Sequence, residues 1–266
     1  METERYNVNT SSGKFKVEKT KTHLRIGGKK FCVEIKFQDS KNPDLAELQW
    51  IYTKDGGCEL DNKMIKGDLT VDMLKLSLTI LKLYREVKYV KLLDNSKYDC
   101  EYEDGSKKTI FINKYNYLFH GGTWYETKVN AIPIDASLKA LYDETKPLYT
   151  DPSTKPISYD FKNTLLQEEL RPIYESTTTW KEFANALHER YDSKTLCKKI
   201  SPWYSDAVEI LTKNRMIPEI WIIDISDINT PFTRIMSGGK RSTRKKYESY
   251  QEHFIMSPGE LYDKKL

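Results

Sequence analysis

The most distinctive string in the chain is Gly-Gly-Thr-Trp-Tyr-Glu, which runs from Gly121 to Glu126. A glycine pair permits a tight turn, and Trp and Tyr each join a large apolar ring to a polar tip. The string suits one wall of a ligand site, and it equally suits a kinked helix with aromatic residues in the core. His120 precedes it and titrates near neutral pH, so it is either a candidate general base or a packed or surface histidine.

A second candidate site is Asp94 with Asn95, directly after the apolar run from Tyr89 to Leu93. Side chains at a strand end project beyond the sheet, where α/β proteins bind ligands. Asp and Asn also hydrogen-bond their own backbone, so a structural turn is the alternative. The sequence carries none of the common phosphate-loop, dinucleotide, nucleophile-elbow or zinc-ligand motifs.

A basic stretch between Gly238 and Lys246 contains no acidic residue. Its cations could neutralise several phosphates, which would make nucleic-acid binding strongly salt dependent. A solvated tail or a localisation signal is the alternative. The nucleic-acid-binding candidates are Lys240, Arg241, Arg244, Lys245 and Lys246.

Composition predicts a folded protein outside the membrane. The 266 residues are 38% hydrophobic and 31% charged, with a net charge of +4. No apolar run is long enough for a membrane helix, and the N-terminal residues lack the apolar stretch of a signal peptide. Four cysteines without a CxxC pair favour reduced thiols in a cytosol-like compartment over a disulfide framework or a zinc site.

Apolar periodicity predicts an α/β (α+β) arrangement that begins at Phe31. Residues 31–37 alternate as a strand does, and Leu48 to Tyr52 predicts a second strand, with Cys58 to Ile65 as its antiparallel partner. Thr70 to Val87 carries apolar residues at spacings of three and four and predicts a mostly buried helix. Tyr89 to Leu93 then predicts another strand, so strands and a helix pack in layers.

The later part of the chain is predicted to be mainly helical. Prolines around residue 150 indicate a linker, Asp160 is the expected cap of a further helix, and Thr179 begins a capping box. Glu219 to Ile225 reads as a strand that returns to a sheet. The expected divisions are a basic flexible arm at 1–30, an α/β domain at 31–150, a helical region with a returning strand at 151–235, and a basic tail at 236–266.

The order of elements between residues 31 and 135 resembles that of the GNAT acyltransferase superfamily. The shared features are a hairpin, a long buried helix, a strand ending in Asp94 and Asn95, and a helix with Tyr125. In that family an Asn at a strand end and a Tyr in the next helix often flank coenzyme A. The resemblance implies Asn95 and Asp94 as cofactor contacts, Tyr125 as general acid, and His120 or Glu126 as base.

A second resemblance concerns origin. Proteins of giant DNA viruses often carry a G-x-T-W-Y-E string and a basic tail, which Gly122 to Glu126 and Gly238 to Lys246 resemble. This resemblance implies a location in the host cytoplasm, the viral factory or the virion.

The sequence leads to one main hypothesis and two alternatives. The family's Q/R-x-x-G-x-G/A turn, which would hold a pyrophosphate at a helix start, is not found between Asp61 and Asp68. We therefore expect a non-catalytic binding or scaffold protein on a GNAT-like core, without a cofactor, that contacts a protein or a nucleic acid. The alternatives are an N-acyltransferase that uses acetyl-coenzyme A, and a structural virion component. Oligomeric state stays open.

Overall fold

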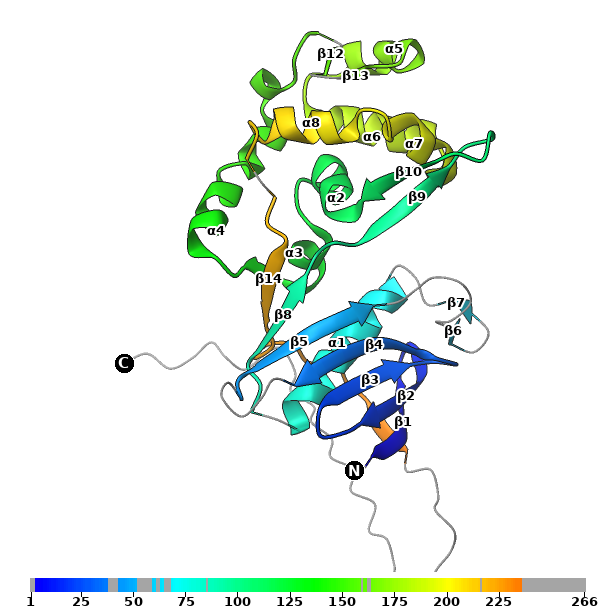
Figure 1. Cartoon of the computed structure of the whole chain (residues 1–266), viewed down its shortest axis with the longest axis vertical. Coiled ribbons are helices and arrows are strands. Elements are labelled where there is room, and N and C mark those ends of the chain that lie inside the picture. The colour runs from blue at the N-terminus through cyan, green and yellow to red at the C-terminus, as the bar shows by residue number, and fades with distance from the viewer. Residues whose placement is uncertain are drawn as a thin grey trace, which may run out of the picture. The chain divides into compact units, whose positions relative to one another are not determined.

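The structure is a computed structural model that describes residues 3–37, 43–51, 59–60, 63–64, 68–84, 86–158, 160–161, 164–215 and 217–235. These residues form an α+β arrangement built on a large mixed sheet (Figure 1). None of the described helices is long and apolar enough to cross a membrane.

Among the described residues, the largest sheet has nine strands in the order β11-β14-β8-β5-β4-β3-β2-β1-β15. Neighbouring strands are antiparallel except β5 and β8, which are parallel. The strand bounds are β1 Glu4–Thr10, β2 Gly13–Lys19, β3 His23–Gly27, β4 Phe31–Phe37, β5 Leu45–Ile51, β8 Tyr89–Leu93, β11 Ile132–Pro133, β14 Ile220–Asp224 and β15 Thr233–Ile235.

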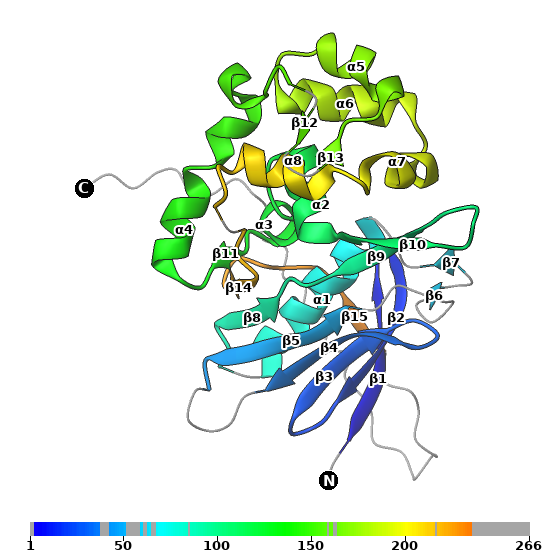
Figure 2. The ribbon, with the colours of Figure 1, turned by 45° about the horizontal axis from the view of Figure 1, so that its top comes forward.

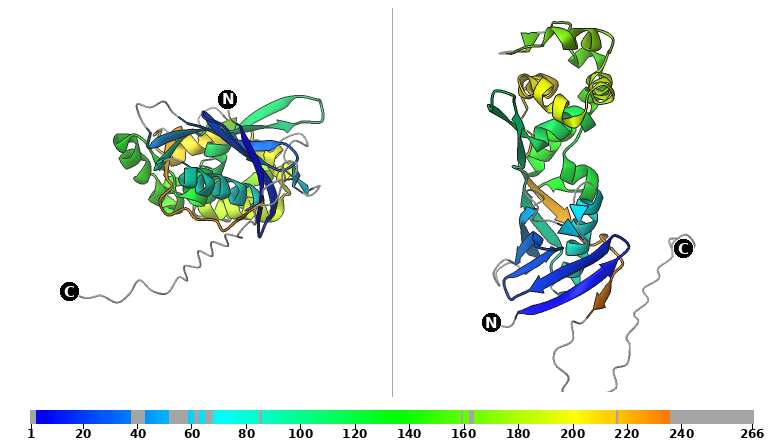
Figure 3. Two further views of the ribbon diagram at one scale, coloured as in Figure 1. Left: turned by 90° about the horizontal axis from the view of Figure 1, so that it is seen from below. Right: turned by 90° about the vertical axis from the view of Figure 1, so that its right-hand side faces the viewer.

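Alternation of apolar and charged residues gives the sheet a buried and an exposed face. In β2, Phe15 and Val17 are fully buried, whereas Lys14 and Lys16 are exposed. The helix α1 Asp68–Tyr84 links β5 to β8 and packs along the buried face (Figure 3). Most of its apolar stripe is buried, from Met73 to Leu81, and Leu83 in the last turn is 64% exposed, so the prediction of a mostly buried helix is confirmed.

The helices after α1 and the β9–β10 hairpin lie on the β8 and β14 side of the described structure, whereas β6 and β7 lie near β2 (Figure 2). Three two-stranded sheets pair β9 Lys97–Glu101 with β10 Lys107–Phe111, β6 Glu59–Leu60 with β7 Lys63–Met64, and β12 Asp160–Phe161 with β13 Thr164–Leu165. The helices are α2 Ile112–His120, α3 Trp124–Val129, α4 Ala136–Asp143, α5 Arg171–Glu175, α6 Trp180–Arg190, α7 Ser193–Ile200 and α8 Tyr204–Leu211, with 3-10 turns η1 Lys146–Thr150, η2 Pro152–Thr154 and η3 Glu168–Leu170.

Aromatic side chains form the centre of the helical part. Phe161, Tyr174, Trp180, Phe183 and Trp203 are buried, and their contacting rings have centroids 5.0 to 6.2 Å apart. Such large rings bury much apolar area per residue and prefer these tilted geometries. The predicted capping box at the start of α6 is confirmed.

A disulfide joins Cys100 in β9 to Cys197 in α7, with the two Cα atoms 5.7 Å apart. Cys32 is also disulfide-bonded. The expectation of reduced thiols is therefore wrong: cysteines 97 positions apart in sequence meet only because the helical part packs against the β9–β10 hairpin. Disulfides of this kind are characteristic of oxidising surroundings.

Several expectations about boundaries are also wrong. The flexible arm at 1–30 is instead the meander β1–β2–β3, because its lysines alternate with buried apolar residues. The boundary expected near residue 150 is absent from the described residues: η1 and η2 occupy the proline-rich stretch, β14 returns to the first sheet, and Met1–Met236 form one compact unit. β6 and β7 pair with each other rather than with β5, and Asp160 belongs to a short strand.

Candidate active site

The strands β5 and β8 start side by side and diverge towards their C-terminal ends (Figure 1). Among the described residues their parallel ladder runs from Leu45 with Tyr89 to Leu48 with Leu92, and ends there. β5 nevertheless continues to Ile51 beside β4. The two strands therefore separate at the edge where parallel strands place ligands.

A β-bulge in β5 accompanies this divergence. Glu34 of β4 pairs with Trp50, but the next residue of β4, Ile35, pairs with Leu48, so Gln49 is the extra residue. A bulge bends its strand and increases the local twist. The bend falls directly after the last ladder pair with β8, which gives β5 a local reason to turn away.

Asp94 lies where β8 ends and is only 1% exposed. Its backbone N–H donates to the carbonyl of Glu219 at 2.7 Å, and its carbonyl accepts from Asn113 Nδ2 at 3.4 Å. Its carboxylate oxygen Oδ2 has no hydrogen-bond partner among the described residues. Burial raises the pKa of Asp94 to about 6, opposed by a hydrogen bond from the Ser96 backbone.

Tyr125 sits in the first turn of α3, whose N-cap is Thr123. It is 7% exposed, and its ring meets that of Trp124 edge to face at 5.0 Å. Burial raises the pKa of the Tyr125 hydroxyl, the charge of Asp94 adds to that shift, and a hydrogen bond with the Ser96 side chain opposes it. Asp94, Ser96 and Tyr125 thus form one buried polar group.

The structure brings together two of the residues selected from the sequence, Asp94 and Tyr125, although they are 31 positions apart in the chain. Asn95 is adjacent to Asp94 but exposed, with no side-chain hydrogen bond among the described residues. A buried carboxyl that titrates near 6 beside a neutral phenol can accept and donate protons near neutral pH.

His120 does not contact this group in the described structure. It is the exposed last residue of α2, where its ring stacks on His188 with centroids 6.1 Å apart. Partial burial lowers the pKa of His120, and the charges of His188 and Lys128 lower it further. His120 therefore forms a surface pair with His188, and the structure does not place it as a base beside Tyr125.

Glu126 is likewise occupied elsewhere. Its Oε2 accepts from the Tyr142 hydroxyl at 2.6 Å, and its Oε1 forms an ion pair with Lys146. Neighbouring positions on a helix point in different directions, so Glu126 and Tyr125 serve different surroundings. Through these two contacts Glu126 links α3 to α4 and to η1.

The glycine pair has a local structural reason. Gly121 caps α2 with φ of 72°, a conformation that favours glycine, and a Cβ there would lie 2.6 Å from the Tyr149 ring. A Cβ on Gly122 would lie 2.8 Å from Glu126. The two glycines therefore form a tight turn between α2 and α3, and the rest of the string begins α3, which places Tyr125.

The basic candidates Lys240, Arg241, Arg244, Lys245 and Lys246 lie outside the described residues, as do most of the positions between Asp61 and Asp68. Among the described residues, no group of three or more His, Cys, Asp or Glu side chains is arranged to hold a metal ion.

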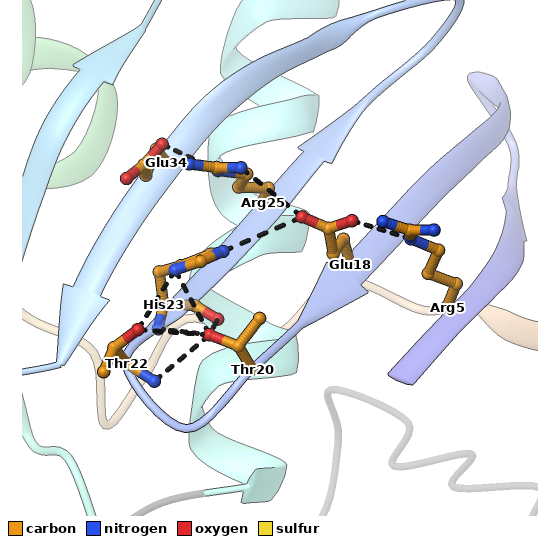
Figure 4. Close-up of polar contacts among 7 residues, drawn as sticks. All are labelled: Arg5, Glu18, Thr20, Thr22, His23, Arg25 and Glu34. Carbon is orange, nitrogen blue, oxygen red and sulfur yellow. Dashed lines mark hydrogen bonds and ion pairs between the residues drawn. The ribbon is translucent and has the colours of Figure 1, made fainter. Parts of the chain in front are cut away.

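A polar network on the exposed face of β1–β4 was not anticipated (Figure 4). Arg5 Nε donates to Glu18 Oε2 at 2.7 Å, Arg25 lies 3.4 Å from Glu18 Oε1, and Arg25 Nε donates to Glu34 at 2.8 Å. Burial alone would raise the pKa of Glu18, but Arg5 and Arg25 outweigh it and lower that pKa. The strand registers, which place these residues opposite one another, are the signal that could have found the row.

In the same network a hydroxyl, an imidazole and a carboxylate lie in sequence. Thr20 Oγ1 is 3.1 Å from His23 Nδ1, and His23 Nε2 is 3.7 Å from Glu18 Oε1. Thr20 Oγ1, however, also accepts the backbone N–H groups of Thr22 and His23 at 3.1 Å. The hydroxyl is thus committed to capping a turn, and the network stabilises the sheet rather than activating a nucleophile.

A hollow of about 350 Å³ lies beside the Cys100–Cys197 disulfide. Its two lysines face carboxylates, Lys198 with Glu103 and Lys199 with Glu169, so it carries little unbalanced charge. It is lined by Tyr102, Glu103, Gln167, Thr195, Lys198 and Lys199.

Comparison of the chain with protein-family models, curated proteins and solved structures finds no match.

Proposed function

We propose that the chain binds an acyl-coenzyme A where β5 and β8 diverge, and transfers the acyl group to an amine. The observation that carries this proposal is the parallel ladder that ends at Leu48 and Leu92, with the bulge at Gln49 directly after it. This arrangement supports the GNAT-like core suggested by the order of elements, and it favours the enzyme alternative over a protein without a cofactor.

Divergence of parallel strands leaves backbone groups available. Beyond Leu48 and Leu92, the facing edges of β5 and β8 present N–H and C=O groups that the described ladder does not pair. The pantetheine arm of coenzyme A is an extended chain with two amide groups. It can pair with such edges as an added strand does, with its thioester towards the polar group at Asp94.

Asp94 and Tyr125 supply the proton transfers that acyl transfer needs. A neutral amine attacks the thioester carbonyl carbon, and the carbon–sulfur bond breaks. Asp94 accepts the proton that the amine nitrogen loses, since its pKa of about 6 keeps the carboxyl mainly ionised at neutral pH. Tyr125 donates its hydroxyl proton to the departing thiolate, so the products are an amide and a thiol.

The second candidate is a non-catalytic binding protein on the same core. It is favoured by the burial of both groups, because Asp94 is 1% and Tyr125 is 7% exposed. A buried pair that no substrate reaches would serve only to fix α3 against the end of β8. The basic residues from Lys240 to Lys246 would then contact nucleic acid or another acidic partner, and a structural virion component is a further form of this candidate.

Calorimetric titration of the full chain with acetyl-coenzyme A tests the proposal. We expect saturable binding, and release of free thiol when a polyamine or a lysine peptide is added. Tyr125→Phe should lower kcat by roughly 100-fold, the usual effect of removing a general acid, with little change in cofactor binding. Asn95→Ala should weaken cofactor binding instead. Tyr98→Phe is the matched control, because it removes the hydroxyl of a half-buried tyrosine in β9 that is not part of the Asp94–Ser96–Tyr125 group.

Two results decide between the candidates. No heat and no thiol release at millimolar acetyl-coenzyme A would overturn the acyltransferase and favour the binding protein. For the binding protein, an electrophoretic shift of nucleic acid at low salt should disappear when residues 238–246 are deleted.

The resemblance to proteins of giant DNA viruses, with a location in the cytoplasm, viral factory or virion, stays a prediction.

A further inference from the structure

The face of the sheet opposite α1 exposes large aliphatic side chains along β8, β14 and β11. Leu93 is 50% exposed, Ile132 and Ile134 are each 47% exposed, and Ile220 is 40% exposed. The residues between them along the strands, such as Val90, Leu92, Trp221 and Ile223, are buried on the other face. Alternation thus places two apolar faces on these strands, and among the described residues the side chains of one face are buried while those of the other are exposed.

The exposed side chains are neighbours. The register pairs Leu93 with Ile220, and Ile222 with both Lys91 and Ile132, while the backbone of Ile134 hydrogen-bonds to Ile220. We name this set, Leu93, Ile132, Ile134, Ile220 and Ile222, the aliphatic face. It is one contiguous block across three strands.

The other half of the same face behaves as a water-exposed sheet should. On β2, β3 and β4 its positions carry Lys16, Arg25, Glu34 and Lys36, joined in part by the ion pairs of Figure 4. An antiparallel sheet with one face in water alternates apolar-in and polar-out. The aliphatic face departs from this rule in a block, which is characteristic of an interaction surface.

We propose that the aliphatic face binds the same face of a second copy of this chain. A two-fold dimer requires a surface that complements itself. The aliphatic face meets this requirement, because its border carries both signs of charge: Lys91 on β8 and Asp224 on β14, with Glu47 of β5 paired to Lys91. When two copies pack with their strands crossed, each Lys91 can meet the Asp224 of the other copy, while the isoleucines meet in the centre.

The size of the face sets the expected strength. Two five-residue strands and the two-residue β11, about 4.8 Å apart and with a rim one residue wide, cover roughly 460 Å² per copy. The total of roughly 900 Å² corresponds to a weak, transient interface. A reversible dimer with a dissociation constant in the micromolar range is therefore expected.

Sedimentation velocity of the full chain over about 1 to 300 μM tests this inference. Wild type should shift from monomer to dimer across that range. Ile220→Asp should raise the dissociation constant at least 100-fold, because it buries a charge in the apolar centre. Ile157→Asp is the matched control: Ile157 is 95% exposed and lies outside the aliphatic face, so its dimerisation should equal that of wild type. Circular dichroism verifies that each variant is folded.

A charge exchange tests whether the partner is a second copy. Lys91→Asp and Asp224→Lys should each dimerise poorly alone, because both put like charges together at two symmetric contacts. An equimolar mixture of the two variants should dimerise as wild type does, because every contact again joins opposite charges. A wild type that stays monomeric, an Ile220→Asp variant that dimerises normally, or a mixture that fails to recover would each overturn the proposal. None of these outcomes depends on acyl transfer.

Discussion

Removal of the Cys100–Cys197 disulfide is the perturbation with the largest expected effect on stability. The bond closes a loop between residues 97 apart and joins the β9–β10 hairpin to α7. It restricts the unfolded chain far more than the folded one, because the packing of α7 against β9 already holds the two segments together. In the chain-entropy account, a loop of about 100 residues corresponds to about 4.7 kcal/mol of stability.

The variant Cys100→Ser/Cys197→Ser is the appropriate probe, because a reducing agent would also break the disulfide of Cys32. Both sulfur atoms belong to buried residues, so the two new hydroxyl groups add a small desolvation cost to the entropic loss. For a chain of this size, about 4.7 kcal/mol corresponds to a fall in Tm of roughly 10–20 °C. Urea unfolding followed by far-UV circular dichroism and Trp fluorescence measures the same loss at constant temperature.

The comparison of wild type, the double Ser variant and Cys100→Ser alone separates the bond from the side chains. Both variants lack the bond and should lose similar stability. A loss below about 1 kcal/mol in the double variant would refute the reasoning, since it would mean that the unfolded chain is not restricted by this loop.

Three further predictions concern single residues. The Asp94 carboxyl has a folded pKa of about 6 against an ordinary 3.8, so the folded state keeps its proton to higher pH than the unfolded state. Wild-type stability should therefore fall by about 2 kcal/mol relative to Asp94→Asn as pH rises from 4 to 6.5, measured by urea unfolding at each pH. Thr179→Ala should lose about 1 kcal/mol by the same assay, because the capping box at α6 loses its side-chain acceptor, whereas an unchanged value would mean that the cap is redundant. Gly121→Ala should lose at least about 1 kcal/mol, since φ of 72° strains an alanine and its Cβ would meet the Tyr149 ring; thermal unfolding with no shift would contradict this assignment.

Local patterns predicted those elements whose hydrophobic period is strong. The strand at residues 31–37, the strand after α1 and the buried helix itself appear where the periodicity places them, because each carries its own apolar stripe. The prediction of a flexible arm at 1–30 is wrong because many lysines in this stretch obscure the apolar alternation of Phe15 and Val17 in β2. Charge density and burial are independent in a strand with one exposed face.

The candidate site was predictable only in its parts. Asp94 was selected because it ends a strand, and Tyr125 because it belongs to an aromatic string, but their proximity depends on how α3 packs beside β8. Asn113, which hydrogen-bonds the Asp94 carbonyl, carries no local signal at all. The same string also suggested Glu126 and His120, whose contacts with Tyr142 and His188 come from segments distant in sequence.

The bulge at Gln49 shows why the site as a whole is a property of the sheet. A single extra residue in β5 shifts its register with β4 directly after the last residue that pairs with β8, yet it leaves no mark on composition or period. Asp94 is buried at this point because β8 stops pairing with β5 while its end stays hydrogen-bonded to the β14 side, through the carbonyl of Glu219. The carboxyl is therefore placed by two strand pairings, one that ends and one that continues.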